Sequence, residues 1–175
     1  MPNTKKADFA SIDVYVKGMM RLLDSPSEMP IFNGYLDDDQ SFSELIAISK
    51  LPEEILVFMK SMNSKLDHII GVLEQNKMET NFPIGIEVYN ISASELLFKT
   101  KEEFTSGSFV EVVLPLTQMP LSIVGGIGEI KSIAHPKFGE IWKFSFTRIR
   151  EQDLESIVHF VFQQERKRIR EIRWD

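Results

Sequence analysis

Few side chains in this sequence have the types and spacing that catalysis requires. The three histidines, His68, His135 and His159, stand alone, without the HxH, HxxxH or HExxH spacing that lets histidines share a metal ion. The 175 residues include no cysteine, which excludes disulfides, thiolate zinc sites, iron–sulfur clusters and thiol nucleophiles. With no pair of nucleophile and base to consider, we predict a protein that is not an enzyme and holds no cofactor or metal.

Two short motifs look like ligand sites but lack the residues that such sites need. The run Asp37–Asp39 would require Gly at the sixth and Glu at the twelfth position of a calcium loop, where the chain has Phe42 and Ile48. The glycine cluster at 125–128 is neither GxGxxG nor a phosphate loop. It lies between strand-like runs, whereas the GxxG loop of a KH domain joins two helices. We expect a solvated loop at the first motif and a bulge or bend at the second.

Composition narrows the class of protein further. Hydrophobic residues make up 43% and charged residues 26% of the chain, which is ordinary for a globular fold and excludes disorder as the main state. A net charge of −6 argues against a general affinity for nucleic acid or anionic lipid. No apolar run approaches the ~20 residues of a membrane span, and the first residues lack the apolar core of a secretory signal. The sequence therefore predicts a cytoplasmic protein without membrane insertion.

Helical periodicity marks both ends and the middle of the chain. Apolar residues recur at helical spacing from Phe9 to Leu23, before a loop over 24–40 and a short helix over 41–49. A long helix is expected from Pro52 to about Lys77, because Pro favours the first turn of a helix. A last helix is expected over 152–173, apolar in its first half and basic in its second.

The long helix carries a heptad seam. Its apolar residues are spaced 4, 3, 4, 3 and 4 apart, which keeps them on one stripe. Leu at position a with Ile at position d favours three or four chains over two in parallel coiled coils. We expect the seam to form a homo-oligomer through Ile55, Met59, Met62, Leu66, Ile69 and Leu73.

After Asn81 the apolar period changes from helical to alternating. Five or six short strands separated by turn signals predict a small antiparallel barrel. The fold class is thus α+β, a barrel with N-terminal helices, including the long heptad helix, and a C-terminal helix. We divide the chain into an N-terminal tail, helix and loop (1–50), the heptad helix (51–79) and the barrel with its last helix (80–175).

The stretch from Ile86 to Arg170 resembles a PilZ domain, a small β-barrel that binds the bacterial messenger cyclic di-GMP. The family motif (D/N)xSxxG matches Asn90-Ile91-Ser92-Ala93-Ser94-Glu95. Further features of the family follow in order, at 104–108, at 112–115, in the closing Phe144-Ser145-Phe146 and in the helix from Val158 to Arg166.

The sequence departs from the family where the ligand is held. The family motif RxxxR should precede Asn90, yet no arginine lies between Arg21 and Arg148. Lys77 is a point charge and does not reproduce the planar fork of an arginine. Glu95 stands at the glycine of the second motif and adds a negative charge where an anionic dinucleotide would approach. The resemblance therefore implies a degenerate site that does not bind cyclic di-GMP.

One branch of the family is similar in a second respect, because its members combine a degenerate site with a long heptad helix and form tetramers. Residues 63–70 resemble that helix. We therefore expect a tetrameric, non-enzymatic PilZ-like regulator or adaptor with a protein partner, linked to cyclic-di-GMP-related control of motility or surface behaviour. A cyclic di-GMP receptor with an unusual site at Arg148 and Arg150 is the alternative. Nucleic-acid binding by the basic C-terminal segment is disfavoured, because residues 164–175 carry a net charge of only +2.

Overall fold

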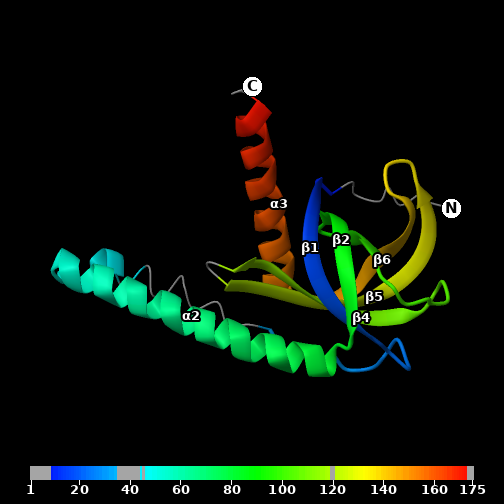
Figure 1. The fold of residues 1–175 in the computed structure, drawn as a ribbon, viewed down its shortest axis with the longest axis horizontal. Coiled ribbons are helices and arrows are strands. Elements are labelled where there is room, and N and C mark those ends of the chain that lie inside the picture. The colour runs from blue at the N-terminus through cyan, green and yellow to red at the C-terminus, as the bar shows by residue number, and fades with distance from the viewer. Residues whose placement is uncertain (1–8, 35–43, 45, 119–120, 173–175) are drawn as a thin grey trace.

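The computed structural model describes residues 9–34, 44, 46–118 and 121–172. Its centre is a closed antiparallel barrel with the strand order β1-β2-β3-β6-β5-β4 (Figure 1). The strands are β1 (Ser11–Leu22), β2 (Ile84–Ser92), β3 (Glu95–Lys99), β4 (Phe109–Gln118), β5 (Leu121–His135) and β6 (Gly139–Ile149). The predicted barrel is confirmed, and it includes one strand more at the N-terminus than the sequence indicated.

The prediction of a helix from Phe9 to Leu23 is wrong, because this segment forms strand β1. Met20 pairs with Ile84 of β2 on one side and with Val112 of β4 on the other. The segment is apolar at helical spacing, but it is also apolar at every second residue from Ile12 to Val16. The segment becomes a strand and not a helix because it pairs with β2 and β4 and thereby closes the barrel.

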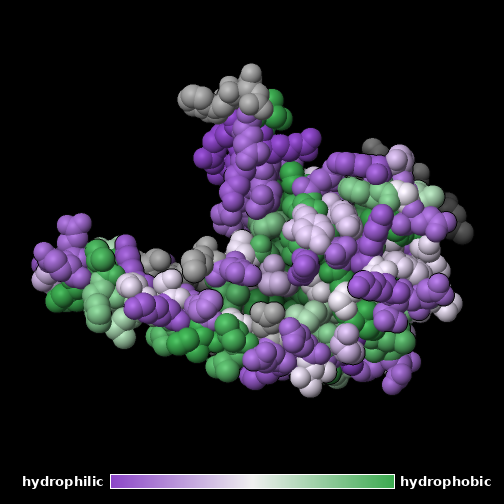
Figure 2. Space-filling model, in the orientation of Figure 1, coloured by the Kyte–Doolittle hydropathy of each residue, from purple (hydrophilic) through white to green (hydrophobic). Residues whose placement is uncertain are grey.

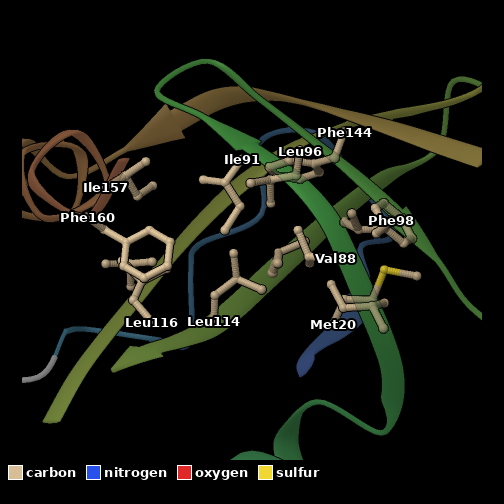
Figure 3. Close-up of a cluster of buried hydrophobic side chains, with 14 of the residues drawn as sticks. Met20, Val88, Ile91, Leu96, Phe98, Leu114, Leu116, Phe144, Ile157 and Phe160 are labelled. Carbon is tan, nitrogen blue, oxygen red and sulfur yellow. The ribbon is translucent and has the colours of Figure 1, made fainter. Parts of the chain in front are cut away.

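The barrel interior is filled by large apolar side chains. Phe98 and Phe144 are fully buried, as is Met20 from β1. Helix α3 (Glu151–Ile172) extends this core with Ile157 and Phe160, which point into the cluster (Figure 3). The C-terminal helix was predicted at these residues. Its second half is polar and stands away from the barrel (Figures 1 and 2).

The glycines at 125–128 do not break the strand as a bend would, since β5 continues through them. The register between β5 and β6 shifts at Ile127 and Gly128, so the expected irregularity is present. A Cβ on Gly128 would lie 2.2 Å from the Ser145 carbonyl oxygen. The glycine therefore allows the neighbouring strand to approach more closely than any side chain would permit.

Helix α2 (Glu53–Asn81) confirms the predicted long helix and begins directly after Pro52. Only its last turns reach the barrel, where Met78 and Phe82 join Val113, Leu121 and Ile123 in a second apolar cluster. The rest of the helix extends away from the barrel (Figure 1). Of the short helix expected at 41–49, residues 44 and 46–48 are helical, and 41–43 lie outside the described residues.

Among the described helices, none is both long enough and apolar enough to cross a membrane.

Candidate functional site

The motif serine, Ser92, is the last residue of β2, directly before the tight turn to β3. The Ser92 hydroxyl is buried, accepts hydrogen bonds from the backbone N–H of Ser94 (3.3 Å) and Glu95 (2.9 Å), and donates to the Glu95 carbonyl oxygen (3.1 Å). A serine that satisfies its own turn in this way fixes the local backbone. Ser92 therefore has a structural role that needs no ligand.

The other two motif residues bind protein groups at the surface. Asn90 donates from Nδ2 to the Asp13 carboxylate at 2.8 Å, and the same carboxylate is paired with Lys137. The hydrogen bond from Lys137, helped by that from Asn90, holds the pKa of Asp13 below its ordinary value. Glu95 forms an ion pair across to β6, with its Oε1 2.8 Å from Nζ of Lys143. The motif thus carries paired charges of both signs.

The alternative donors, Arg148 and Arg150, face the segment 23–34, called the strap below, which follows β1. Arg148 donates from Nη2 to the carbonyl oxygens of Pro26 and Glu28. Arg150 donates from Nη1 to the carbonyl oxygen of Asn33. Both guanidinium groups therefore hold the strap against the end of β6 in this structure.

Arg150 also joins the strap to helix α3. Its Nε and Nη2 donate to both carboxylate oxygens of Asp153 at 2.7–3.0 Å, and its guanidinium lies 5.3 Å from the ring centroid of Phe32. Asp153 is buried and also accepts from the backbone N–H of Gly125. Burial raises the pKa of Asp153, although the hydrogen bonds from Arg150 oppose that shift. Arg150 and Asp153 together therefore connect the barrel, the strap and helix α3.

A second strap anchor was missed by reasoning from the sequence. Glu111, the third residue of β4, is fully buried and accepts from Arg21 Nε (2.7 Å) and from the backbone N–H of Ile31 (3.1 Å) and Phe32 (2.9 Å). A carboxylate this deep requires such partners, because an unpaired buried charge is costly. The available signal was a lone glutamate inside the apolar run from Phe109 to Leu114.

The heptad seam of α2 is exposed along its length. Its six side chains have exposed fractions between 38% for Met59 and 57% for Leu73, and the remaining four are Ile55, Met62, Leu66 and Ile69. Phe58 and Val72 beside the seam are exposed as well. Apolar side chains are visible along α2 on the molecular surface (Figure 2). Monomeric proteins rarely leave so long an apolar stripe in water.

Within the described part of the chain, no group of three or more metal-ligating side chains lies together. The run Asp37–Asp39 falls outside the described residues.

No protein-family model matches the chain, and no curated protein matches it. Several solved structures are similar to it. A protein from Xanthomonas campestris, described as a tetrameric PilZ domain self-assembled through an unusual helical bundle, matches with a TM-score of 0.55 and 14% identity. That match covers 94% of this chain and 90% of the other.

Two further matches have lower TM-scores. The inhibitor of motility MotI/DgrA from Bacillus subtilis has a TM-score of 0.42 and 16% identity, over 48% of this chain and 43% of that protein's length. The PilZ domain of YcgR from Escherichia coli, solved with c-di-GMP, has a TM-score of 0.38 and 11% identity, over 51% of this chain and 77% of that one. The six-stranded barrel with its closing helix, taken with the nearly full-length Xanthomonas match, shows that this chain has a PilZ-like fold.

Proposed function

We propose that this protein is a non-enzymatic PilZ-like regulator or adaptor that assembles through α2 and acts without binding cyclic di-GMP. The observation that carries the proposal is the exposed apolar seam on a helix that meets its own barrel only at one end. Such a helix is suited to pack against copies of itself.

The seam provides enough apolar surface for assembly. Full burial of a Leu, Ile or Met side chain is worth about 1.5–3 kcal/mol, and roughly half of that remains available at each half-exposed seam residue. Six such residues therefore offer several kcal/mol per chain. Leu66 and Leu73 at position a with Ile69 at position d favour three or four chains. The Xanthomonas protein, described as a tetramer formed through a helical bundle, makes four our expectation.

The charges around the motif support the second half of the proposal. Glu95 and Lys143 neutralise one another, and Asp13 neutralises Lys137. Arg148 and Arg150 bind the strap. An incoming dinucleotide would have to break these contacts, and the chain lacks the arginine pair of the family motif that would bind it in return. The contacts formed with the ligand would therefore do little more than replace those lost within the protein.

The biological setting follows from the family resemblance, which indicates cyclic-di-GMP-related control of motility or surface behaviour. We propose that the output passes through a protein partner, with neither nucleic acid nor membrane insertion involved.

The decisive experiment combines the mass in solution with a ligand titration in the same buffer. We expect a species of four times the 20.2 kDa chain, and no heat of binding for cyclic di-GMP with a Kd below about 0.1 mM. A monomer at tens of micromolar would contradict assembly through α2. A saturable low-micromolar isotherm would instead favour the alternative function, a receptor in which Arg148 and Arg150 release the strap and bind the ligand.

A further inference from the structure

An aromatic patch crosses the outside of the barrel where β1, β2 and the β5–β6 hairpin meet. It consists of Tyr15, Tyr89, Phe138 and His135. The ring centroids of Tyr15 and Tyr89 are 5.8 Å apart, those of Tyr89 and Phe138 are 5.6 Å apart, and His135 stacks on Phe138 at 4.9 Å. Tyr15 is 58% exposed. Four rings in sequence thus form a continuous surface that the described part of the chain leaves open to solvent at Tyr15.

The patch is held in one arrangement by Glu87. The hydroxyl groups of Tyr15 and Tyr89 both donate to its carboxylate, at 2.8 and 3.2 Å. The hydrogen bond from Tyr15, with that from Tyr89, lowers the pKa of Glu87. Rings that are already fixed lose little conformational entropy when a partner binds, which is one reason why tyrosine is common in binding hot spots.

The charge around the patch is opposite to that of the whole protein. Lys99 lies over Tyr89 at 5.7 Å and Lys137 lies over Phe138 at 5.4 Å. Lys17 and Lys101 act electrostatically on Glu87, and Arg168 acts on Asp13. Of these five cations, Lys137 is paired with Asp13, while Glu87 accepts from the two tyrosine hydroxyls. Positive charge therefore exceeds negative charge among the named groups. A chain with a net charge of −6 has here a local cationic surface.

The patch is separate from the assembly helix. Tyr15 lies in the first half of β1, whereas α2 packs near Met19 toward the other end of that strand. Assembly through the α2 seam therefore uses none of the patch residues.

We propose that this aromatic patch docks an acidic peptide segment of a partner protein, one that carries an aromatic or large apolar side chain. The lysines complement the acidic residues of such a segment, and the rings offer it apolar area together with fixed geometry. The inference rests on the proposed adaptor function and names the surface through which it acts.

A peptide fits the patch better than single-stranded nucleic acid does. Tyr15 meets Tyr89 edge to face at 66°, and Tyr89 is tilted by 42° to Phe138, so the rings pack on one another instead of lying open as parallel platforms for bases.

The test starts from a random 12-residue peptide library displayed on phage and selected on the full chain. We expect the selected peptides to be enriched in Asp and Glu together with Phe, Tyr, Trp or Leu. Synthetic copies, measured by fluorescence anisotropy, should bind at least tenfold more weakly to Tyr15→Ala and to Lys99→Glu. Lys60→Glu on the exposed surface of α2 is the matched control and should bind like the wild type. Tyr15→Phe keeps the ring but loses the hydrogen bond to Glu87, so it should bind more tightly than Tyr15→Ala and more weakly than the wild type.

Three results would overturn the proposal: selected peptides without acidic enrichment, binding that survives Tyr15→Ala and Lys99→Glu, or tight binding of an oligo(dT) 15-mer that these variants abolish. Thermal unfolding of each variant checks that the barrel remains intact. The same anisotropy measurement on the seam variant Leu66→Asp with Ile69→Asp separates the two proposals, because peptide binding by a monomer would support the patch even if assembly has another role.

Discussion

The barrel core and the α2 seam contain the same kinds of side chain in opposite surroundings. In the core, Phe98 and Phe144 are fully buried, with Ile157 of α3 covering the cluster. Along the seam, Leu66 and Ile69 are about half exposed. The barrel core is therefore covered within one chain, while the helix retains apolar surface that the described part of the chain leaves exposed. Apolar patterning predicts burial, but only the tertiary structure shows whether the covering surface belongs to the same molecule.

The largest effect should come from charging the seam. Replacing Leu66 and Ile69 together with Asp would bury like charges in the centre of a helical bundle, where each uncompensated charge costs several kcal/mol. We expect a monomer that keeps the β-rich circular dichroism spectrum of the barrel, with the mass measured by light scattering.

The matched control for this variant is Ser61→Asp with Ser64→Asp, two exposed residues of α2 outside the seam, which should leave the assembly unchanged. A double seam variant with the wild-type mass would show that α2 is not the interface. Complete unfolding would show that the seam stabilises the chain itself, or that the barrel cannot stand without assembly.

A smaller effect, confined to the barrel, is expected from Phe98→Ala. Truncating a fully buried Phe removes its transfer free energy and leaves a cavity, so the free energy of unfolding should fall by about 3–5 kcal/mol. Urea unfolding followed by circular dichroism measures the loss. Phe162→Ala on α3 makes the same chemical change at a side chain that is 51% exposed, and it should cost less than about 1 kcal/mol. Equal losses at the two positions would contradict the burial contrast.

The smallest effect is expected at the motif, from Asp13→Asn. Because Lys137 and Asn90 hold the folded-state pKa of Asp13 below its ordinary 3.8, the ionised carboxylate stabilises the fold above that pH. The contribution disappears as the pH falls through the lower folded-state value. Both partners are well exposed, so the variant should lose less than about 1 kcal/mol at pH 7.

Urea unfolding at pH 7 and in acid tests the sign of this effect. The difference between Asp13→Asn and wild type should shrink as the solution becomes acidic. Glu155→Gln, which changes an exposed carboxylate of α3, should show no such trend. A difference that grows in acid would contradict the assigned stabilisation.

Local patterns were enough to predict α2, α3 and five of the six strands, because each has a clear period over its own residues. They failed at β1, where Ile12, Val14 and Val16 fit a strand while the whole segment fits a helix. That choice is made by pairing with residues of β2 and β4 that are 64 to 94 positions away in sequence. The residues around β1 in the sequence therefore carry no information about its pairing with β2 and β4.

The candidate site likewise combines features that the sequence predicts with contacts that it does not predict. The identity of Glu95 and the missing arginines were read directly from the sequence, but the partners of Glu111, Arg148 and Arg150 were not. Arg21 and Glu111 are 90 residues apart in the chain, and Arg148 reaches Pro26 across 122. Contacts of that range depend on how the strap crosses the finished barrel, so only the three-dimensional structure reveals them.

Helix α2 is anchored to the barrel at its C-terminal end, through Met78 and the following Phe82. Its 29 residues correspond to a length of about 43 Å at 1.5 Å per residue, so a tilt of about 10° at the base moves the far end by about 7 Å. Phe32 of the strap packs against the same cluster as the C-terminal end of α2. The strap therefore lies beside the end of the helix about which such a tilt would occur. In the assembly proposed above, such a tilt would change the positions of the barrels relative to one another.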